Sequence, residues 1–312
     1  FMIIVIHENN EWISPFTAAF EKLNFDYHIW YVPEMSLDLA ALPTDAVYWN
    51  RMSASSHTRG HRYEPELVSG ILSWLERHKR TVINGSKALD LEISKIRQYQ
   101  QLEQFSIKTP KTFCAIKKED LIKGANRIGF PLITKHNRAG KGLGVRKFDN
   151  EEALKDYIFG NDFEASPDGI TLLQEYVYAP SQSIVRMEFV NFKFLYAVEV
   201  DTSQGFELCP ADTCEIESNC PTEHFNKFKI NEKFSIPNIS DFENFLRGND
   251  IGIAGIEIIF DENGSCWTYD VNTNTNYNSK AEEQADQNAP EEVARFLGAL
   301  SKYTGPATSL SS

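Results

Sequence analysis

The segment that decides the fold is residues 253–272, IAGIEIIFDENGSCWTYDVN. Asn263-Gly264 stands between two apolar-rich runs and predicts a two-residue hairpin turn. With that turn Glu257 lies directly opposite Asp270, with about 5 Å between their Cβ atoms. Asn272 shares their face because side chains alternate along a strand. The segment therefore predicts a hairpin on which two carboxylates and an amide oxygen converge.

Facing carboxylates repel each other, so the pair needs a physical reason to exist. A hard divalent cation removes the repulsion, and Mg²⁺ accepts such oxygen ligands while phosphate oxygens and water complete its shell. The alternative is a chance pair that is exposed to solvent. We predict a magnesium site formed by Glu257, Asp270 and Asn272.

A glycine-rich loop, Gly140-Lys141-Gly142-Leu143-Gly144, follows the apolar strand Pro131–Lys135. The loop matches neither the dinucleotide-binding nor the Walker pattern. Glycines nevertheless let successive backbone N–H groups cradle phosphate oxygens, although an ordinary turn would also suit this composition. Together with Lys135 and the acidic pair, the loop predicts that the ligand is a nucleoside triphosphate.

The length of 312 residues implies two or three subdomains, because a single core stops growing at about 250–300 residues. In the first 90 residues predicted strands alternate with helices, which indicates a mostly parallel sheet covered by helices. The strands expected there are 2–6, 27–32, 46–49 and 81–84, with helices after Ser14-Pro15 and over 65–77. Further on, we expect helices within 86–104 and over 118–128, 150–159 and 290–300, and strands at 112–115, 132–136, 144–148, 171–176, 185–190 and 192–200.

The net charge of −13 disfavours nucleic acid and anionic membranes as partners. No apolar run approaches the roughly 20 residues that span a bilayer, and Met2–Ile6 is too short for a signal peptide. We therefore expect a cytoplasmic protein, with a homodimer as an open option. Five cysteines form an odd set that indicates reduced thiols, and the spacing of Cys209, Cys214 and Cys220 fits no zinc pattern.

Four segments, taken in order, resemble the ATP-grasp carboxylate–amine ligases, most closely the branch that adds glutamate to a ribosomal protein. The segments are Ser94-Lys95 with 105–112, 129–135 with 140–145, 172–177, and 254–257 with 269–272. The resemblance implies an α/β and α+β chain, an ATP-grasp fold with an N-terminal Rossmann-like (pre-ATP-grasp) domain. We expect domains at 1–93 and 94–303, lobes at 94–168 and 169–303 within the second domain, and a disordered tail at 304–312.

The resemblance also implies a reaction. An ATP- and Mg²⁺-dependent ligase would activate a carboxylate as an acyl phosphate and join it to an amine of amino acid or peptide type, releasing ADP and phosphate. One or two Mg²⁺ ions are expected, with Mn²⁺ as a substitute. The alternatives are an ATP-dependent phosphotransferase and a non-catalytic ATP-binding regulatory or scaffold protein on the same fold.

Each matching residue has an expected role. Lys95 and Lys135 would neutralise the α- and β-phosphates, and Arg186 would steady the acyl phosphate, so that Lys135 and Arg186 are the expected catalytic residues. The remaining ATP contacts would be Gly140, Lys141, Gly142 and Gly144 over the β- and γ-phosphates, and Gln174, Glu175 and Val177 at the adenine edge.

The sequence also departs from the family. Residues 273–278 lack the common Pro-Gly, which leaves the shape of the acceptor site open, and residues 179–183 lack the acid often placed near the ribose. Arg51 closes the third strand, where open α/β sheets bind ligands, so it is a candidate for a substrate carboxylate or for a salt bridge. Asn274 is a second candidate substrate contact.

Three other segments remain ambiguous. His7 and Asn9 follow the first strand and face the same crevice, although a core or capping role for His7 is the simpler interpretation. Residues 57–62 hold two histidines and two arginines, either as a solvated loop or as a contact for an anionic substrate or a lid. Residues 206–212 could be an insertion at the acceptor site.

Overall fold

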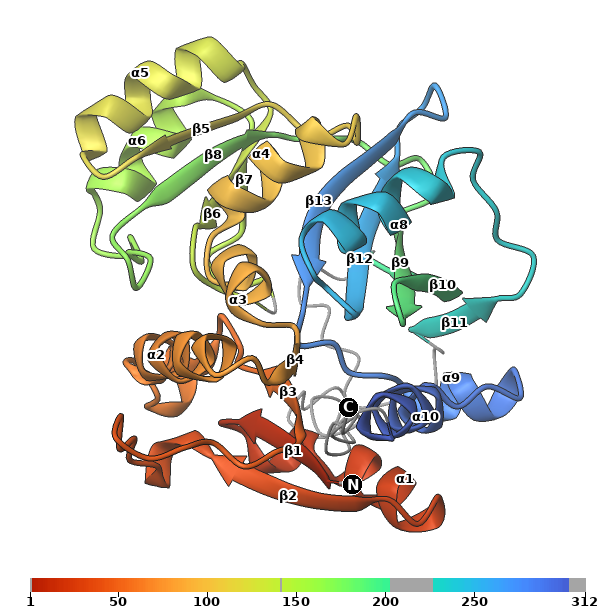
Figure 1. The fold of residues 1–312 in the computed structure, drawn as a ribbon. Coiled ribbons are helices and arrows are strands. Elements are labelled where there is room, and N and C mark those ends of the chain that lie inside the picture. Colours follow the sequence, from red (N-terminus) through yellow and green to blue (C-terminus); the bar gives the residue numbers. More distant parts are fainter. Residues whose placement is uncertain (1, 141, 203–226, 303–312) are drawn as a thin grey trace, which may run out of the picture.

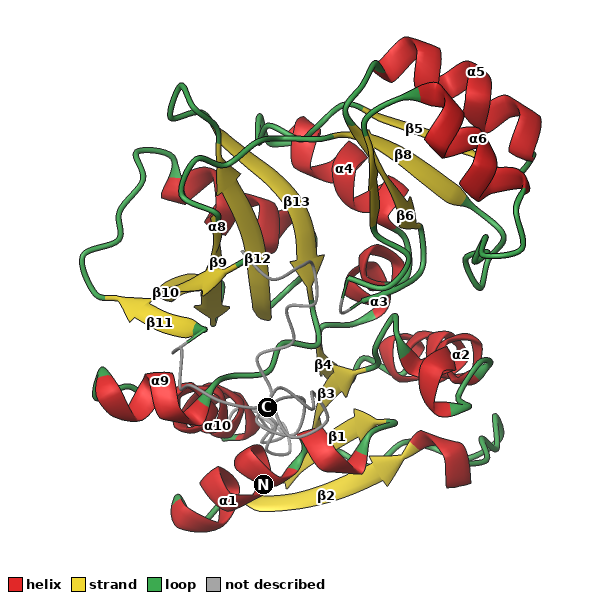
Figure 2. Ribbon diagram, turned by 180° about the vertical axis from the view of Figure 1, so that it is seen from behind, coloured by secondary structure: helices red, strands yellow, loops and turns green. Residues whose placement is uncertain are grey.

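A computed structural model describes residues 2–140, 142–202 and 227–302. Lys141, the segment 206–212, the cysteines at 209, 214 and 220, and the tail 304–312 lie outside the described residues. Within them the chain forms three sheets, each covered by helices (Figures 1 and 2).

The N-terminal sheet has the order β2-β1-β3-β4, and all its neighbours are parallel. Its strands are β1 (Met2–His7), β2 (Asp26–Tyr31), β3 (Val47–Arg51) and β4 (Thr81–Ile83), with α1 (Ser14–Lys22) and α2 (Glu64–Arg77) between them. Ile3 and Val5 pack with α1, whereas Ile4 and Ile6 pack with α2. The alternation of strand side chains thus buries both faces, and the predicted Rossmann-like sheet is confirmed.

The last described helix returns to this N-terminal sheet. α10 (Ala289–Ser301) begins at the N-cap Asn288 with Pro290 in its first turn. Its Val293 and Leu297 belong to the same core cluster as Phe16 of α1. α10 therefore covers the face that α1 covers, and the N-terminal domain and the end of the chain share one core (Figure 1).

The second sheet is antiparallel in its order β5-β8-β6-β7. It contains β5 (Thr112–Ala115), β6 (Leu132–His136), β7 (Arg146–Phe148) and β8 (Thr171–Glu175), covered by α5 (Lys118–Ile128) and α6 (Glu151–Phe159). We placed the lobe boundary at residue 168, which is wrong: β8 pairs with both β5 and β6, so the first lobe extends through Glu175. The helices α3 (Ser86–Glu92) and α4 (Lys95–Gln104) connect this lobe to the N-terminal sheet.

The third sheet has the order β11-β10-β9-β12-β13. Its strands are β9 (Ser183–Val190), β10 (Lys193–Asp201), β11 (Phe228–Asn231), β12 (Ile253–Phe260) and β13 (Cys266–Asn272). The sequence interpretation missed β11, α8 (Ile239–Gly248) and α9 (Ser279–Gln284). α8 nevertheless buries Phe242, Phe245 and Leu246, which follow helical spacing. None of the helices in the described ranges is long and apolar enough to cross a bilayer.

The β12–β13 hairpin differs from the predicted turn. Asp261 N–H donates to the Ser265 carbonyl at 3.1 Å, so three residues rather than two form the loop, and Gly264 occupies its left-handed position at φ 74°. That loop alone would shift the register by one. A bulge at Tyr269 restores it, because Ile258 pairs with Thr268 while Glu257 pairs with Asp270. The predicted pairing of the two carboxylates is confirmed, although the predicted turn is wrong.

Candidate functional site

A cavity of about 380 Å³ lies where the three sheets meet. Its walls include Ser53 and Ser55 from the loop after β3, Ile133 and Lys135 from β6, and Ile259 from β12. The volume falls in the range of small-molecule sites, roughly 300–1,000 Å³. Apart from Gly144, all the predicted ATP, metal and catalytic residues within the described ranges line it, as does Asn274 but not Arg51.

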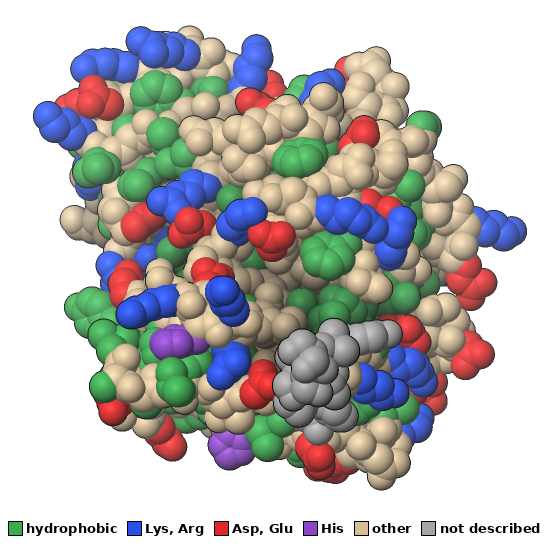
Figure 3. All heavy atoms as spheres, viewed as in Figure 1, with side chains coloured by type: hydrophobic (Ala, Val, Ile, Leu, Met, Phe, Trp, Pro, Cys, Tyr) green, Lys and Arg blue, Asp and Glu red, His purple; other side chains and the backbone are tan. Residues whose placement is uncertain are grey.

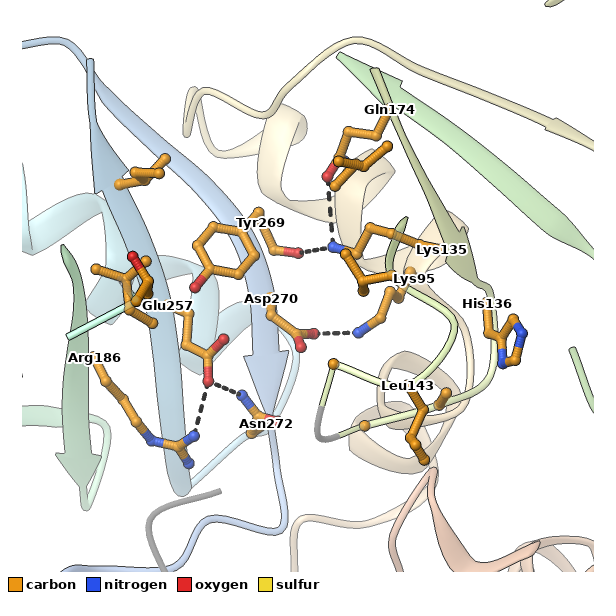
Figure 4. Close-up of a pocket in the computed structure, with 18 of the residues that line it drawn as sticks. Lys95, Lys135, His136, Leu143, Gln174, Arg186, Glu257, Tyr269, Asp270 and Asn272 are labelled. Carbon is orange, nitrogen blue, oxygen red and sulfur yellow. Dashed lines mark hydrogen bonds and ion pairs between the residues drawn. The ribbon is translucent and has the colours of Figure 1, made fainter. Parts of the chain in front are cut away.

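The acidic pair occupies one wall of this cavity, on neighbouring strands (Figure 4). Glu257 of β12 is paired in register with Asp270 of β13 on one side and with Arg186 of β9 on the other. Asn272 Nδ2 donates to Glu257 Oε1 at 3.4 Å. Two carboxylates and one amide therefore face the cavity together, with an arginine beside them.

Two buried lysines face the acidic pair from the first lobe (Figure 4). Lys95, in the first turn of α4, donates from Nζ to Asp270 Oδ1 at 2.5 Å. Lys135 Nζ donates to Tyr99 Oη at 3.0 Å, to the Tyr269 carbonyl at 3.2 Å and to Gln174 Oε1 at 3.4 Å. Because the acceptors of Lys135 are neutral, its charge is available to an anion in the cavity.

The residue that follows β6 holds the first turn of α4, and with it Lys95, in position. Asn137, directly after the strand, accepts from the Ile96 N–H at 3.0 Å through its side chain and from the Lys95 N–H at 3.1 Å through its carbonyl. The two lysines are thereby fixed relative to each other, although they lie on separate elements.

The glycine-rich loop borders the cavity through Gly140, Gly142 and Leu143. Gly144 has φ 71°, and a Cβ there would lie 2.4 Å from His136 Nε2, so a larger residue fits neither the backbone nor the space. The loop therefore runs close to the end of β6, the strand that carries Lys135.

The predicted adenine edge lies at the end of β8. Gln174, Glu175 and Val177 all line the cavity. Glu175 N–H bonds to the Lys111 carbonyl at 2.9 Å, while its carboxylate accepts from the Lys111 N–H at 2.8 Å. The residue is thus held on both sides at the point where the chain leaves the first lobe.

Arg186 of β9 is buried, and each of its three nitrogens donates one hydrogen bond to the protein. Its Nε donates to Glu188 Oε1 at 2.6 Å, Nη1 to Glu257 Oε1 at 2.9 Å and Nη2 to Thr275 Oγ1 at 2.7 Å. Gly255 makes room for it, because a Cβ there would lie 2.6 Å from Nη2.

Arg51 connects the N-terminal domain to the loop that follows β13. Its Nη2 donates to Asn274 Oδ1 and Asn276 Oδ1 at 2.8 Å and to the Thr275 carbonyl at 2.9 Å. Its Nη1 donates to the Trp12 carbonyl at 3.2 Å. The two candidate substrate residues, Arg51 and Asn274, thus bind each other, and of the two only Asn274 reaches the cavity.

The charges of the site are strongly coupled. Burial alone would raise the pKa of Asp270, but Lys95 and Lys135 outweigh it and hold that pKa below its usual value. Burial raises the pKa of Glu257, against the opposing effect of Arg186. Burial also lowers the pKa of Lys135. The cavity therefore holds Asp270 ionised between two cations.

Burial would likewise lower the pKa of Arg186, but the carboxylates of Glu188 and Glu257 more than compensate and raise it. Arg186 therefore stays protonated across the physiological range. For Arg51, burial lowers the pKa to about 9, which still leaves the guanidinium charged near neutral pH.

The donor set fits a hard cation that is shared with phosphate. Across the described ranges there is no cluster of three or more His, Cys, Asp or Glu side chains that could hold a metal by itself. Glu257, Asp270 and Asn272 supply two carboxylates and an amide, which suits Mg²⁺ bound through few protein ligands with phosphate oxygens and water as the others.

The remaining sequence candidates have structural roles. His7 is buried, with Nδ1 3.1 Å from the Asn9 carbonyl, as the core or capping interpretation expects. The basic loop is only partly exposed, and its Arg59 and His61 both contact the buried carboxylate of Glu8, at 2.5 and 2.9 Å. The loop is thus tied to the buried Glu8 by the Arg59 ion pair and the His61 contact.

Sequence reasoning missed several cavity and support residues: Trp12, Ser53, Ser55, Glu92, Glu188 and Thr275. They lie in loops, in a short 3₁₀ helix, at the end of α3 and in β9, at positions with no motif, and only the packing of the three sheets brings them together. On the face shown in Figure 3, acidic and basic side chains are interspersed, so the net charge describes the whole surface and not this cavity.

Solved structures with the same architecture decide the fold. The ATP-grasp ligase PsnB, solved with a minimal precursor, matches 95% of this chain and 98% of its own with a TM-score of 0.68 at 14% identity. A RiPP-associated ATP-grasp ligase from Chryseobacterium gregarium, solved with ADP and a leader and core peptide, matches 96% of this chain and 97% of its own with a TM-score of 0.64 at 14% identity. The chain has the ATP-grasp fold.

Sequence relatives cover the ATP-grasp chain only in part. An alpha-aminoadipate–LysW ligase of Saccharolobus solfataricus is 32% identical over 104 residues, 33% of this chain and 38% of the relative. A phosphoribosylamine–glycine ligase of Fusobacterium nucleatum is 30% identical over 114 residues, 35% of this chain and 27% of the relative. The chain thus matches well under half the length of these curated relatives, and no family model matches it.

Proposed function

We propose that this protein is an ATP- and Mg²⁺-dependent ligase that joins a carboxylate to an amine. The observation that carries the proposal is the convergence of Lys95, Lys135 and Arg186 on the pair Glu257 and Asp270 in one cavity. Transfer of a phosphoryl group to a carboxylate brings anion to anion, and catalysis then depends on cations aimed at the transferring group.

Glu257, Asp270 and Asn272 are the residues that would hold Mg²⁺. When bound, the ion would neutralise the negative charge that develops during transfer. One or two ions, with Mn²⁺ as a substitute, belong to the same proposal. A structure of PsnB solved with Mg and ADP supports the choice of Mg²⁺.

The chain's own residues supply the remaining functions. Lys95 and Lys135 bind the α- and β-phosphates, and the backbone of Gly140, Gly142 and Gly144 covers the β- and γ-phosphates and excludes water. Lys141 belongs to the same proposed set of ATP contacts. At the other end, Gln174, Glu175 and Val177 hold the adenine edge, next to the apolar side chains of Ile133 and Ile259.

The reaction then follows in two steps. A carboxylate oxygen of the acid attacks the γ-phosphorus and the bond to the β–γ bridging oxygen breaks, which gives an acyl phosphate and ADP. A neutral amine attacks the acyl carbon, the bond from that carbon to the phosphate oxygen breaks, and the amine loses a proton as phosphate leaves. Arg186 binds the acyl phosphate and stabilises its charge in both steps.

The residues at the substrate end of the cavity favour an acid whose only charged group is the reacting carboxylate and whose other polar groups form hydrogen bonds. Ser53, Ser55, Asn274 and Asn276 line this end together with Trp12. Glu92 also lines the cavity, but its carboxylate accepts from the backbone N–H groups of Ala54 and Thr273, and Arg51, outside the cavity, is bonded to protein groups. A peptide or a capped amino acid satisfies this description, and the named relatives and structures are ligases of amino acids and peptides.

A screen of acids and amines tests the proposal. Amino acids and short peptides are offered in pairs with Mg·ATP, and ADP release and product mass are measured. We expect ADP release that requires both partners, with a product of the summed mass less one water. Release with the acid alone, with a persistent phosphorylated product, would indicate a phosphotransferase. Nucleotide binding without any turnover would indicate a regulatory or scaffold protein.

A further inference from the structure

The loop 273–276, which lacks the Pro-Gly pair of the resembled family, is held from the N-terminal side by three buried side chains. Asn84 Nδ2 donates to the Thr273 carbonyl at 2.8 Å, and Glu92 Oε2 accepts from the Thr273 N–H at 2.7 Å. Arg51 Nη2 donates to the Thr275 carbonyl at 2.9 Å. Hydrogen bonds thus fix the backbone of this loop against the N-terminal domain.

On its other side the loop meets Arg186. The Thr275 hydroxyl accepts from Arg186 Nη2 at 2.7 Å and donates to Glu188 Oε2 at 2.8 Å. Arg186 Nε donates to Glu188 Oε1 at 2.6 Å, which closes a ring of three buried side chains. Neither Thr275 nor Glu188 lines the cavity.

The geometry of this ring sets the direction of the guanidinium. Two of the three nitrogens of Arg186, Nε and Nη2, are fixed by Glu188 and Thr275, and the third, Nη1, then points to Glu257 at 2.9 Å. Glu188 offsets the buried charge, whereas the Thr275 hydroxyl carries none. Thr275 therefore orients the guanidinium of Arg186 without offsetting its charge. Thr275 is itself held in place by the hydrogen bond from Arg51 to its carbonyl.

We propose that Thr275 is a positioning residue, which with Glu188 orients Arg186 toward the metal carboxylates and transmits the position of the N-terminal domain to the reacting end of the cavity. The proposal rests on the proposed function for what Arg186 does, but not for how Arg186 is held.

A spectroscopic experiment tests the orientation without any substrate. The Nε–H resonance of Arg186 is recorded in protein with ¹⁵N-labelled arginine and assigned by its loss in Arg186→Lys. We expect Thr275→Val to shift or broaden it and Thr275→Ser, which keeps the hydroxyl, to leave it in place. An unchanged resonance in Thr275→Val would overturn the proposal.

A kinetic experiment tests the consequence. Thr275→Val should lower kcat about 10- to 100-fold, the effect of one hydrogen bond to a charged group, and Thr275→Ser should restore it to within a few-fold. The dissociation constant for Mg·ADP should stay within about twofold of the wild-type value because Thr275 lies outside the cavity.

The hairpin offers a matched control. Thr268 of β13 is also fully buried, but its hydroxyl has no hydrogen-bond partner within the described part of the chain. Thr268→Val should therefore leave kcat unchanged. Equal kcat values in Thr275→Val and Thr268→Val, or no rescue by Thr275→Ser, would overturn the proposal. A wild-type protein without turnover would refute the proposed function instead, and the resonance would still decide how Arg186 is held.

Discussion

Replacing Gly255 by alanine should damage catalysis without damaging the fold. The added Cβ would lie 2.6 Å from Arg186 Nη2 and 2.8 Å from Nε, whereas ordinary contacts of this kind begin near 3.4 Å. The guanidinium would have to move by about 0.8 Å, and a misplacement of roughly 1 Å can cost about 100-fold in rate. We therefore expect a 10- to 100-fold lower kcat in Gly255→Ala.

The assay measures ADP release with a productive acid–amine pair, together with Mg·ADP affinity by calorimetry and the thermal midpoint. Gly70→Ala in α2 is the matched control, because nothing lies within 4 Å of its added Cβ. That variant should keep full activity and gain about 0.4–1 kcal/mol of stability. A Gly255→Ala enzyme with wild-type kcat would refute the placement of Arg186 against this strand.

Three further outcomes are expected. Lys135→Ala should weaken ATP binding at least tenfold by calorimetry, because it removes a buried cation from the proposed phosphate site. The control Lys123→Ala removes an exposed lysine and should leave the affinity unchanged. Equal ATP affinities in the two variants would show that Lys135 does not bind phosphate. Asp270→Asn should abolish Mg²⁺-dependent turnover in a folded protein, and removal of Mg²⁺ by a chelator should do the same in the wild type. The surface control Asp90→Asn should remain active. Turnover that survives both the Asp270→Asn substitution and chelation would refute the metal assignment. Burial lowers the pKa of His7 below its usual 6.5, so the folded state favours neutral imidazole, and the thermal midpoint should fall as the pH drops from about 7 to about 5. In His7→Gln the thermal midpoint should depend less on pH over this range. The same pH dependence in His7→Gln as in the wild type would contradict this role of His7.

The parts of the site that follow chain-local rules could be predicted from the sequence. Side-chain alternation and a hairpin turn predict that Glu257 and Asp270 lie opposite each other, and the lysine before a glycine-rich loop indicates a phosphate site. The turn itself was misjudged because an Asn-Gly pair also suits a three-residue loop, in which Gly264 takes the left-handed position. The bulge at Tyr269 leaves no mark in the residue pattern, yet it decides the register.

Contacts between domains could not be predicted in the same way. Arg51 was a reasonable candidate for a substrate carboxylate, since it closes a parallel strand. Most of its acceptors, however, are carbonyl and amide oxygens more than two hundred residues away, on the loop after β13. The lobe boundary predicted at residue 168 differs from the structure for a similar reason. Only the pairing of β8 with β5 and β6 assigns β8 to the first lobe.

The central claim is that ATP activates a carboxylate. The measurement that tests it most directly uses an acid labelled with ¹⁸O in its carboxylate, turned over with the partner amine and Mg·ATP. Mass spectrometry of the released phosphate should find one ¹⁸O atom per turnover, carried over from the acid through the acyl phosphate. Phosphate without ¹⁸O, formed alongside the amide product, would contradict the account.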